Sequence, residues 1–159
     1  GNATLKQTFA FADVDGGIQE GVFSLIHRIL GETWLSVSGH VLSISRLMVD
    51  AGAKVILVPA AFNMTTGPAH WELLFRSRAV DNQVYTVGTA PARDPKASYQ
   101  SWGHSIICSP WGDVLMQADE TERVIITALD LNRLEEVRQQ LPLLKHRRTD
   151  VYRPERVLP

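Results

Sequence analysis

The sequence contains little that is typical of a secreted, membrane-bound or nucleic-acid-binding protein. Its single cysteine, Cys108, cannot form an internal disulfide, which agrees with a reducing compartment. Sixteen basic and seventeen acidic residues give a net charge of -1, and no long run of either sign indicates a surface for phosphates or anionic lipids. The apolar stretches are far shorter than the roughly 20 residues of a transmembrane helix, and the N-terminus does not read as a secretion signal. We therefore expect a soluble, cytoplasmic protein that binds neither nucleic acid nor membranes.

The hydrophobic pattern divides the chain near Ile44. Of the 159 residues 45% are hydrophobic, which suffices for one folded domain with a modest core. The first 45 residues show no stable period, so we treat 1–45 as an atypical segment to which the pattern assigns no regular structure. From Ile44 onward, apolar positions recur at helical spacing and Gly52 follows the expected helix end. The second part of the chain is therefore the part with a readable fold.

The remaining pattern predicts alternating strands and helices. The run from Lys54 to Ala60 is continuously apolar and β-branched, which is typical of a strand buried on both faces. A helix is expected to follow, capped by Thr66, and to end near Asn82. Asp130 is suited to cap a last helix, which Pro142 ends, and the tail after it should lie across another surface. Further strands are expected at Val84–Ala90, His104–Ser109, Val114–Ala118 and Arg123–Asp130, with the middle two forming a hairpin.

Three stretches carry a resemblance to a known family. They read AGAKVILVPAAFNMTTGPAHWELLFRSRAVDNQVYTVGTAPARD, GHSIICSPWGDVL and ALDLNRLEEVRQQLPLLKHRRTDVY. In this order and at compatible spacing they resemble the nitrilase superfamily of carbon–nitrogen hydrolases, in particular its omega-amidase branch. The resemblance covers about two thirds of the chain. It implies an α/β fold in which residues 46–152 form the C-terminal half of a nitrilase-type α-β-β-α sandwich and 153–159 form a tail.

The family's catalytic residues have no recognisable counterpart in this sequence. The resemblance implies a cysteine nucleophile, a glutamate base and a lysine that stabilises the oxyanion, with neither cofactor nor metal. Glutamate and lysine belong to the first half of a family subunit, which these 159 residues do not match. The cysteine position falls on Ser36 and the arginine of the same motif falls on His40. By resemblance the chain is an amidase for dicarboxylic acid monoamides, yet we predict it to be inactive alone; the alternative is a non-catalytic dimerisation or ligand-binding remnant.

Other candidate catalytic groups are interpreted as structural. Cys108 lies in the apolar segment HSIICS, where a buried core thiol is expected rather than a nucleophile. Three histidines would suit a general base, but the sequence pairs none of them with a partner, so packing or surface roles are favoured. These histidines are His40, His70 and His104.

Substrate binding is better represented than catalysis. In the omega-amidase branch the loop after the strand that follows the cysteine binds the substrate's distal carboxylate through a main-chain group and a threonine hydroxyl. The resemblance places these roles on Phe62 and Thr66. A helix N-terminus favours an anion because its free N–H groups and dipole point toward it. The alternative is that Thr66 only caps the helix.

Two helical segments are expected to mediate self-association. The resemblance implies a subunit interface built from Ser45–Asp50 and Pro68–Asn82. We also expect the apolar stripe of the second segment, which includes Trp71 and Phe75, to be only partly covered in half a sandwich. Glu72 and Arg76, four residues apart, are expected to form a solvated or dimer-facing ion pair rather than to act in catalysis.

The change of character near Ile44 is abrupt. A shift of reading frame upstream of this residue would explain it, since codons for Gly39–Ser43 read one nucleotide later can encode a sequence close to the family's motif. A truncated or spliced product and a chimera are the alternatives. The nucleotide sequence distinguishes them.

Overall fold

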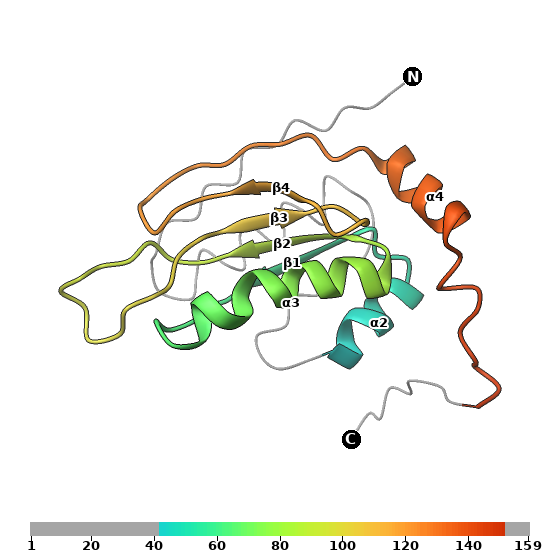
Figure 1. Ribbon diagram of the computed structural model, residues 1–159, viewed down its shortest axis with the longest axis horizontal. Helices are drawn as coiled ribbons and strands as arrows, with labels where there is room; N and C mark the ends of the chain where they lie inside the picture. Colours follow the sequence, from blue (N-terminus) through green and yellow to red (C-terminus); the bar gives the residue numbers. More distant parts are fainter. Residues whose placement is uncertain (1–41, 152–159) are drawn as a thin grey trace.

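A computed structural model of the protein describes residues 42–151, with side chains from Ser45 onward. It is a mixed α/β structure in which helices pack on a four-stranded sheet (Figure 1). The expectations for 1–41, which include Ser36 and His40, and for the end of the tail fall outside the described residues. The elements are α2 (Leu42–Asp50), β1 (Val55–Pro59), α3 (Thr66–Asn82), β2 (Tyr85–Thr89), β3 (Ile106–Cys108), β4 (Val114–Gln117) and α4 (Leu131–Gln140).

The sheet has the order β1-β2-β3-β4. β1 and β2 are parallel and joined by α3, whereas β3 pairs antiparallel with both of its neighbours. β3 and β4 form the expected hairpin, with an irregularity between Ile107 and Cys108. Because β1 and β2 are parallel, the loops that follow them leave the sheet at the same edge. This edge carries Phe62 and Thr66, to which the resemblance assigns substrate binding.

α3 covers one face of the sheet (Figure 1). Trp71, Phe75 and Ala79 of this helix pack with Ile106 and Cys108 of β3. We expected Trp71 and Phe75 to be only partly covered, but both are buried because β2 and β3 lie directly beneath the helix. The expected helix end is confirmed, since Asn82 is the last residue of α3.

The approach of α3 to the sheet depends on a glycine. A Cβ on Gly88 of β2 would lie 2.5 Å from Cζ of Phe75, so any larger residue would push the helix away from the strand. The neighbouring Thr86 donates a hydrogen bond from its hydroxyl to the carbonyl of Phe75 at 3.0 Å. Helix and strand are thus held at short range by one small residue and one polar contact.

α2 builds a second cluster at the end of β1. Met48 and Val49 are buried against Ile56 and Val84, and Gly52 ends the helix region with a φ of 100°, as expected. The segment after α4 also reaches this cluster, because Leu144 packs against it. The described part of the tail therefore lies across another surface, as predicted. Arg147 further forms an ion pair with Asp50 at the end of α2.

Two strand expectations are wrong in part. β1 was expected to be buried on both faces, but only Ile56 is fully buried, because β1 is an edge strand of the described sheet. Residues 123–130 were expected to form a strand, but they lack regular strand pairing, and Val124 and Ile126 are exposed. A strand requires a hydrogen-bonded neighbour, and the described residues supply none for this segment.

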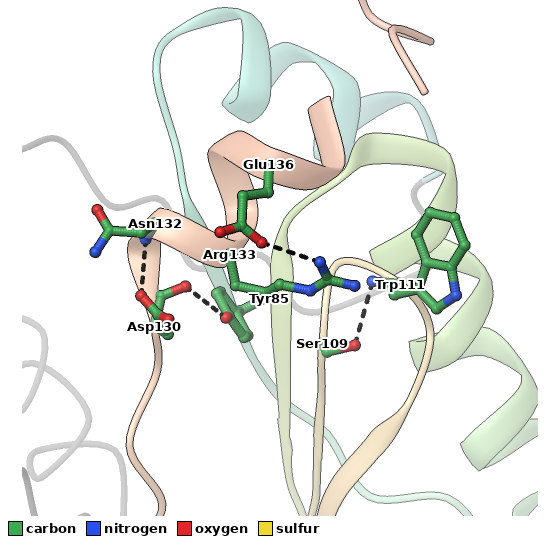
Figure 2. A network of polar contacts seen from close by, with 7 residues as sticks. All are labelled: Tyr85, Ser109, Trp111, Asp130, Asn132, Arg133 and Glu136. Atoms are coloured by element: carbon green, nitrogen blue, oxygen red, sulfur yellow. Dashed lines mark hydrogen bonds and ion pairs between the residues drawn. The ribbon is translucent and has the colours of Figure 1, made fainter. Parts of the chain in front are cut away.

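α4 begins as the sequence predicts. The Asp130 carboxylate accepts a hydrogen bond from the amide of Asn132 at 2.9 Å, and the Asp130 carbonyl accepts one from the Tyr85 hydroxyl at 2.7 Å (Figure 2). This second contact ties the helix start to β2. Leu134 and Val137 are buried, whereas Leu131 and Leu141, at the two ends of the helix, are exposed.

Candidate functional site

Two loops meet at the edge of the sheet where β1 and β2 end. The first comprises residues 60–65 and the second comprises residues 90–105. The amide of Trp102 donates a hydrogen bond to the carbonyl of Phe62 at 2.7 Å, and the Tyr99 hydroxyl donates one to the carbonyl of Ala61 at 2.8 Å. The second loop therefore fixes the position of the first. Phe62 and Thr66, the predicted substrate-binding residues, both lie at this junction.

Trp102 is the central side chain of the junction. A Cβ on Gly67 would lie 2.2 Å from Cγ of Trp102, so the indole occupies the space that only a glycine leaves at the start of α3. The ring stacks on His104 with centroids 4.1 Å apart. Arg93 lies over the same ring at 5.5 Å and donates hydrogen bonds to the carbonyls of Ser101 and Trp102, each at 3.0 Å. These contacts hold the indole in one place.

The ring of Phe62 is used for packing, so its main-chain groups are the ones to consider for ligand binding. The half-buried ring packs edge-on against Trp71 at 5.1 Å, and its carbonyl is occupied by the amide of Trp102. Its own amide N–H has no hydrogen-bond partner among residues 42–151. Of the two main-chain polar groups of Phe62, the carbonyl is thus engaged by a described residue, whereas the N–H is not.

Thr66 does not cap α3, contrary to the expectation. The residue at the cap position is Thr65, whose side chain makes no capping bond, and Thr66 is already helical. Instead the Oδ1 atom of Asn63 accepts hydrogen bonds from the amides of Thr65 and Thr66, at 3.0 and 2.8 Å, and from the Thr66 hydroxyl at 3.0 Å. An asparagine reaches the amides two and three residues onward, so it closes the helix end from outside.

Cys108 has the properties of a core thiol. It is buried in β3 and faces α3, and burial raises its pKa from 9.0 to about 11. At neutral pH the group is therefore the neutral thiol, whereas a nucleophilic cysteine reacts as the thiolate. This agrees with its interpretation as a structural residue.

The histidines of the described region do not form a catalytic pair. His104 has a φ of 62°, and its Nδ1 lies 2.7 Å from the carbonyl of Trp102. Its own carbonyl accepts a hydrogen bond from Nε1 of Trp71 at 2.6 Å, so the residue joins the loop to α3. His70 is exposed. Within residues 42–151 no group of His, Cys, Asp or Glu side chains is arranged to hold a metal ion.

The surface pair on α3 is confirmed. Arg76 and Glu72 lie 3.1 Å apart, and both side chains are about half exposed, so the pair is a solvated one. Arg76 also donates from Nε to the carbonyl of Gly112 at 2.8 Å. That turn is organised by Ser109, whose hydroxyl oxygen accepts a hydrogen bond from the amide of Trp111 at 3.2 Å (Figure 2).

None of the helices in residues 42–151 is long and apolar enough to cross a membrane.

Sequence reasoning missed three residues that build the junction. The role of Asn63 was detectable, because an asparagine three residues before a helix start is a common local cap. Trp102 carried no such signal, since its contacts with Phe62 and Gly67 join segments that are far apart in the sequence, and Arg93 acts on Trp102 from within the second loop. Their positions depend on the pairing of β1 with β2.

The comparisons with known proteins agree with this architecture. The family model described as carbon-nitrogen hydrolase matches residues 39–139. The chain belongs to the carbon–nitrogen hydrolase family. The match includes the sheet, α3 and both loops of the junction.

Similar carbon–nitrogen hydrolases include the omega-amidases NIT2 of Mus musculus and Xenopus tropicalis, which are 51% and 53% identical to this chain over 109 residues. Each alignment covers 69% of this chain, which spans about 40% of the length of either relative.

Solved structures show the same fold. Nit3 of Saccharomyces cerevisiae, a member of branch 10 of the nitrilase superfamily, matches with a TM-score of 0.64 and 47% identity, over 66% of this chain and 39% of that one. The NitFhit protein of C. elegans matches with a TM-score of 0.67 and 37% identity, over 70% of this chain and 27% of that one. Residues 42–151 therefore have a nitrilase-superfamily fold, as the sequence resemblance implied.

Proposed function

We propose that this carbon–nitrogen hydrolase chain is of the omega-amidase type and contributes the part of the site that binds the distal carboxylate of a dicarboxylic acid monoamide. The observation that carries the proposal is the roughly 50% identity to omega-amidases over a segment that includes both loops of the junction. We place the protein in the cytoplasm, where its buried thiol remains reduced.

The geometry of the first loop supports carboxylate binding. The Phe62 amide N–H lacks a partner among the described residues, and the Thr66 hydroxyl lies at the start of α3, where the helix dipole favours negative charge. One amide and one hydroxyl donor suit the two oxygens of a carboxylate. Because Trp102 fixes the carbonyl of Phe62, the loop is preorganised for such a ligand.

We further propose that the 159-residue chain alone does not hydrolyse the amide. The family's chemistry needs a cysteine, a base and an oxyanion donor that converge on one carbonyl. The only cysteine of the chain is Cys108, which lies in the core with a raised pKa. Ser36, the position at which the resemblance places the family cysteine, has a hydroxyl that is a weak nucleophile without an adjacent base.

The test of inactivity is ammonia release from a dicarboxylic acid monoamide. We expect background rates for the unmodified chain and for Ser36→Cys, because loss of any member of a catalytic unit removes most of its effect. Cys108→Ala serves as the control for the core thiol. Turnover by the unmodified chain that disappears in Cys108→Ala or Ser36→Ala would overturn the proposal.

The test of binding is titration with 2-oxoglutarate, a dicarboxylate without the amide. Thr66→Ala should weaken binding by roughly 1.5–3 kcal/mol, the value of a hydrogen bond to a charged group. Thr65→Ala is the matched control, because its side chain makes no capping bond. Equal affinities of the wild-type chain and Thr66→Ala would exclude this loop from the site.

A second proposal is self-association through the outer face of α3. Leu73 is 62% exposed on this helix, and Trp111 of the nearby turn is 49% exposed. In α2, by contrast, Ser45 and Met48 are buried within the chain, so α3 dominates the proposed surface. Interfaces of ordinary strength associate at protein concentrations of roughly tens of micromolar. Light scattering at such a concentration should therefore show a species larger than the monomer, and Leu73→Glu should reduce its population. A monodisperse wild-type monomer would contradict the proposal.

A further inference from the structure

One oxygen atom closes the N-terminus of α3. Asn63 Oδ1 accepts the amides of Thr65 and Thr66 together with the Thr66 hydroxyl, at 3.0, 2.8 and 3.0 Å. A carbonyl oxygen has two lone pairs, so three donors exceed what it satisfies well. The two amides cannot turn away because the helix backbone holds them. The hydroxyl is the one donor that rotates freely, and it can leave while the oxygen keeps both amides.

The identity of the accepting atom also fixes the direction of the hydroxyl bond. Because two backbone N–H groups point at it, this atom must be the carboxamide oxygen, and the Thr66 hydroxyl must be the donor. A ligand carboxylate that accepts from Thr66 competes with Asn63 for a single proton. Both acceptors then lie about 3 Å from the same hydroxyl oxygen, so they are separated by no more than about 6 Å.

At this separation the charge of residue 63 affects the ligand directly. Asparagine and aspartate cap helices about equally well, and an anion at a helix N-terminus is favourable for stability. An aspartate would therefore satisfy the same two amides, yet its charge would repel a carboxylate within about 6 Å and hold the hydroxyl more strongly. Helix stability alone does not require the neutral side chain.

We propose that Asn63 is a specificity-determining residue: its uncharged carboxamide caps α3 while leaving the Thr66 hydroxyl and the helix dipole available to a ligand carboxylate. This inference rests on the proposed carboxylate site. It assigns the selection of an anionic ligand to the absence of charge at position 63. Trp102 also holds the loop through the carbonyl of Phe62, and this hydrogen bond opposes a shift of the cap away from the ligand.

The experiment compares Asn63→Asp with Asn63→Ser in the full chain. Both variants keep a capping oxygen, but only the aspartate adds a charge. Calorimetric titration with 2-oxoglutarate should show binding at least about tenfold weaker for Asn63→Asp and within about threefold of wild type for Asn63→Ser. The thermal midpoint of Asn63→Asp should equal or exceed that of wild type. The affinity difference between the two variants should shrink as NaCl rises from about 0.05 to about 0.5 M, because salt screens exposed charges.

Two outcomes would overturn the inference while leaving the carboxylate site in place. One is a wild-type affinity in Asn63→Asp, and the other is an equal loss in both variants. Absence of binding by the wild-type chain would instead refute the proposed function, and the inference with it. A folded Asn63→Asp that has lost affinity, beside an Asn63→Ser that has kept it, would establish the role.

Discussion

The side of the sheet packed against α3 differs sharply from the region that comprises β4 and residues 118–130. Beside α3, Trp71, Ile106 and Cys108 are fully buried, and the two loops of the junction are linked by hydrogen bonds. Every residue of β4 is exposed, and Val124 and Ile126 in the following segment are more than half exposed. Both regions nevertheless have β-branched, apolar sequences.

The difference shows that an apolar sequence pattern identifies side chains that are suited to burial, but does not identify the segment that covers them. α3 follows β1 directly, so the cover for this part of the sheet lies nearby in the sequence. Residues 123–130 have no such neighbour, since no backbone hydrogen bond pairs them with another segment within residues 42–151. The chain spans about 40% of the length of its omega-amidase relatives.

The largest effect on stability is expected from a comparison of two tryptophans, one on each side of this contrast. Trp71→Ala should lower the free energy of unfolding by about 3–5 kcal/mol, since a large buried side chain is removed. It also loses the indole hydrogen bond to the carbonyl of His104. Trp111→Ala, at an exposed turn next to β4, should change it by less than about 0.5 kcal/mol. Urea denaturation at low micromolar concentration measures both, and similar losses would show that the two regions are equally packed.

A smaller effect is expected from two glycines. In an open helix Gly→Ala raises stability by up to about 1 kcal/mol, but Gly67→Ala should instead lower it by about 1–3 kcal/mol, because the new methyl overlaps Trp102. The control is Gly52→Ala, which meets no atom within 4 Å and is strained only by its positive φ. If Gly67→Ala stabilises the chain, the indole does not pack against the start of α3. Tryptophan fluorescence of this variant should also report movement of Trp102.

The sequence predicted elements whose partners are close along the chain. The end of α3 at Asn82, the β3–β4 hairpin and the Asp130 cap follow from local periodicity, turn residues and capping chemistry. Residues 123–130 were wrongly predicted to form a strand, because strand pairing depends on a distant neighbour, which no local pattern reveals.

The candidate site was predictable only in outline. The resemblance placed Phe62 and Thr66, and the structure brings them to one junction. It did not show that Asn63 rather than Thr66 caps α3, because both residue types are favoured at helix starts. Arg93 and Trp102 became visible only when β1 and β2 were paired and their loops adjoined.

The smallest expected effect is on the pH dependence of stability, and it reports the burial of the α3 side through the titration of the Cys108 thiol. In the unfolded chain this thiol has its ordinary pKa of 9.0, whereas burial in the folded chain raises the pKa to about 11. Between these values the unfolded state has released the proton that the folded state retains, so stability falls as pH rises. Below pH 9 the group has no effect on the pH dependence. The slope contributed by one such group is at most about 1.4 kcal/mol per pH unit.

Cys108→Ala isolates this contribution, since other groups titrate equally in both proteins. Burial also raises the pKa of Tyr85, which adds a slope of the same sign to both curves and cancels in the difference. We therefore expect the stability curves of wild type and Cys108→Ala, measured by urea denaturation, to run parallel up to about pH 9 and then to converge or cross, because only the wild-type curve carries the thiol's downward slope. Curves that stay parallel to pH 11, together with rapid alkylation of the folded wild-type chain at pH 8, would show that the thiol is accessible and that the α3 side of the sheet is open to solvent.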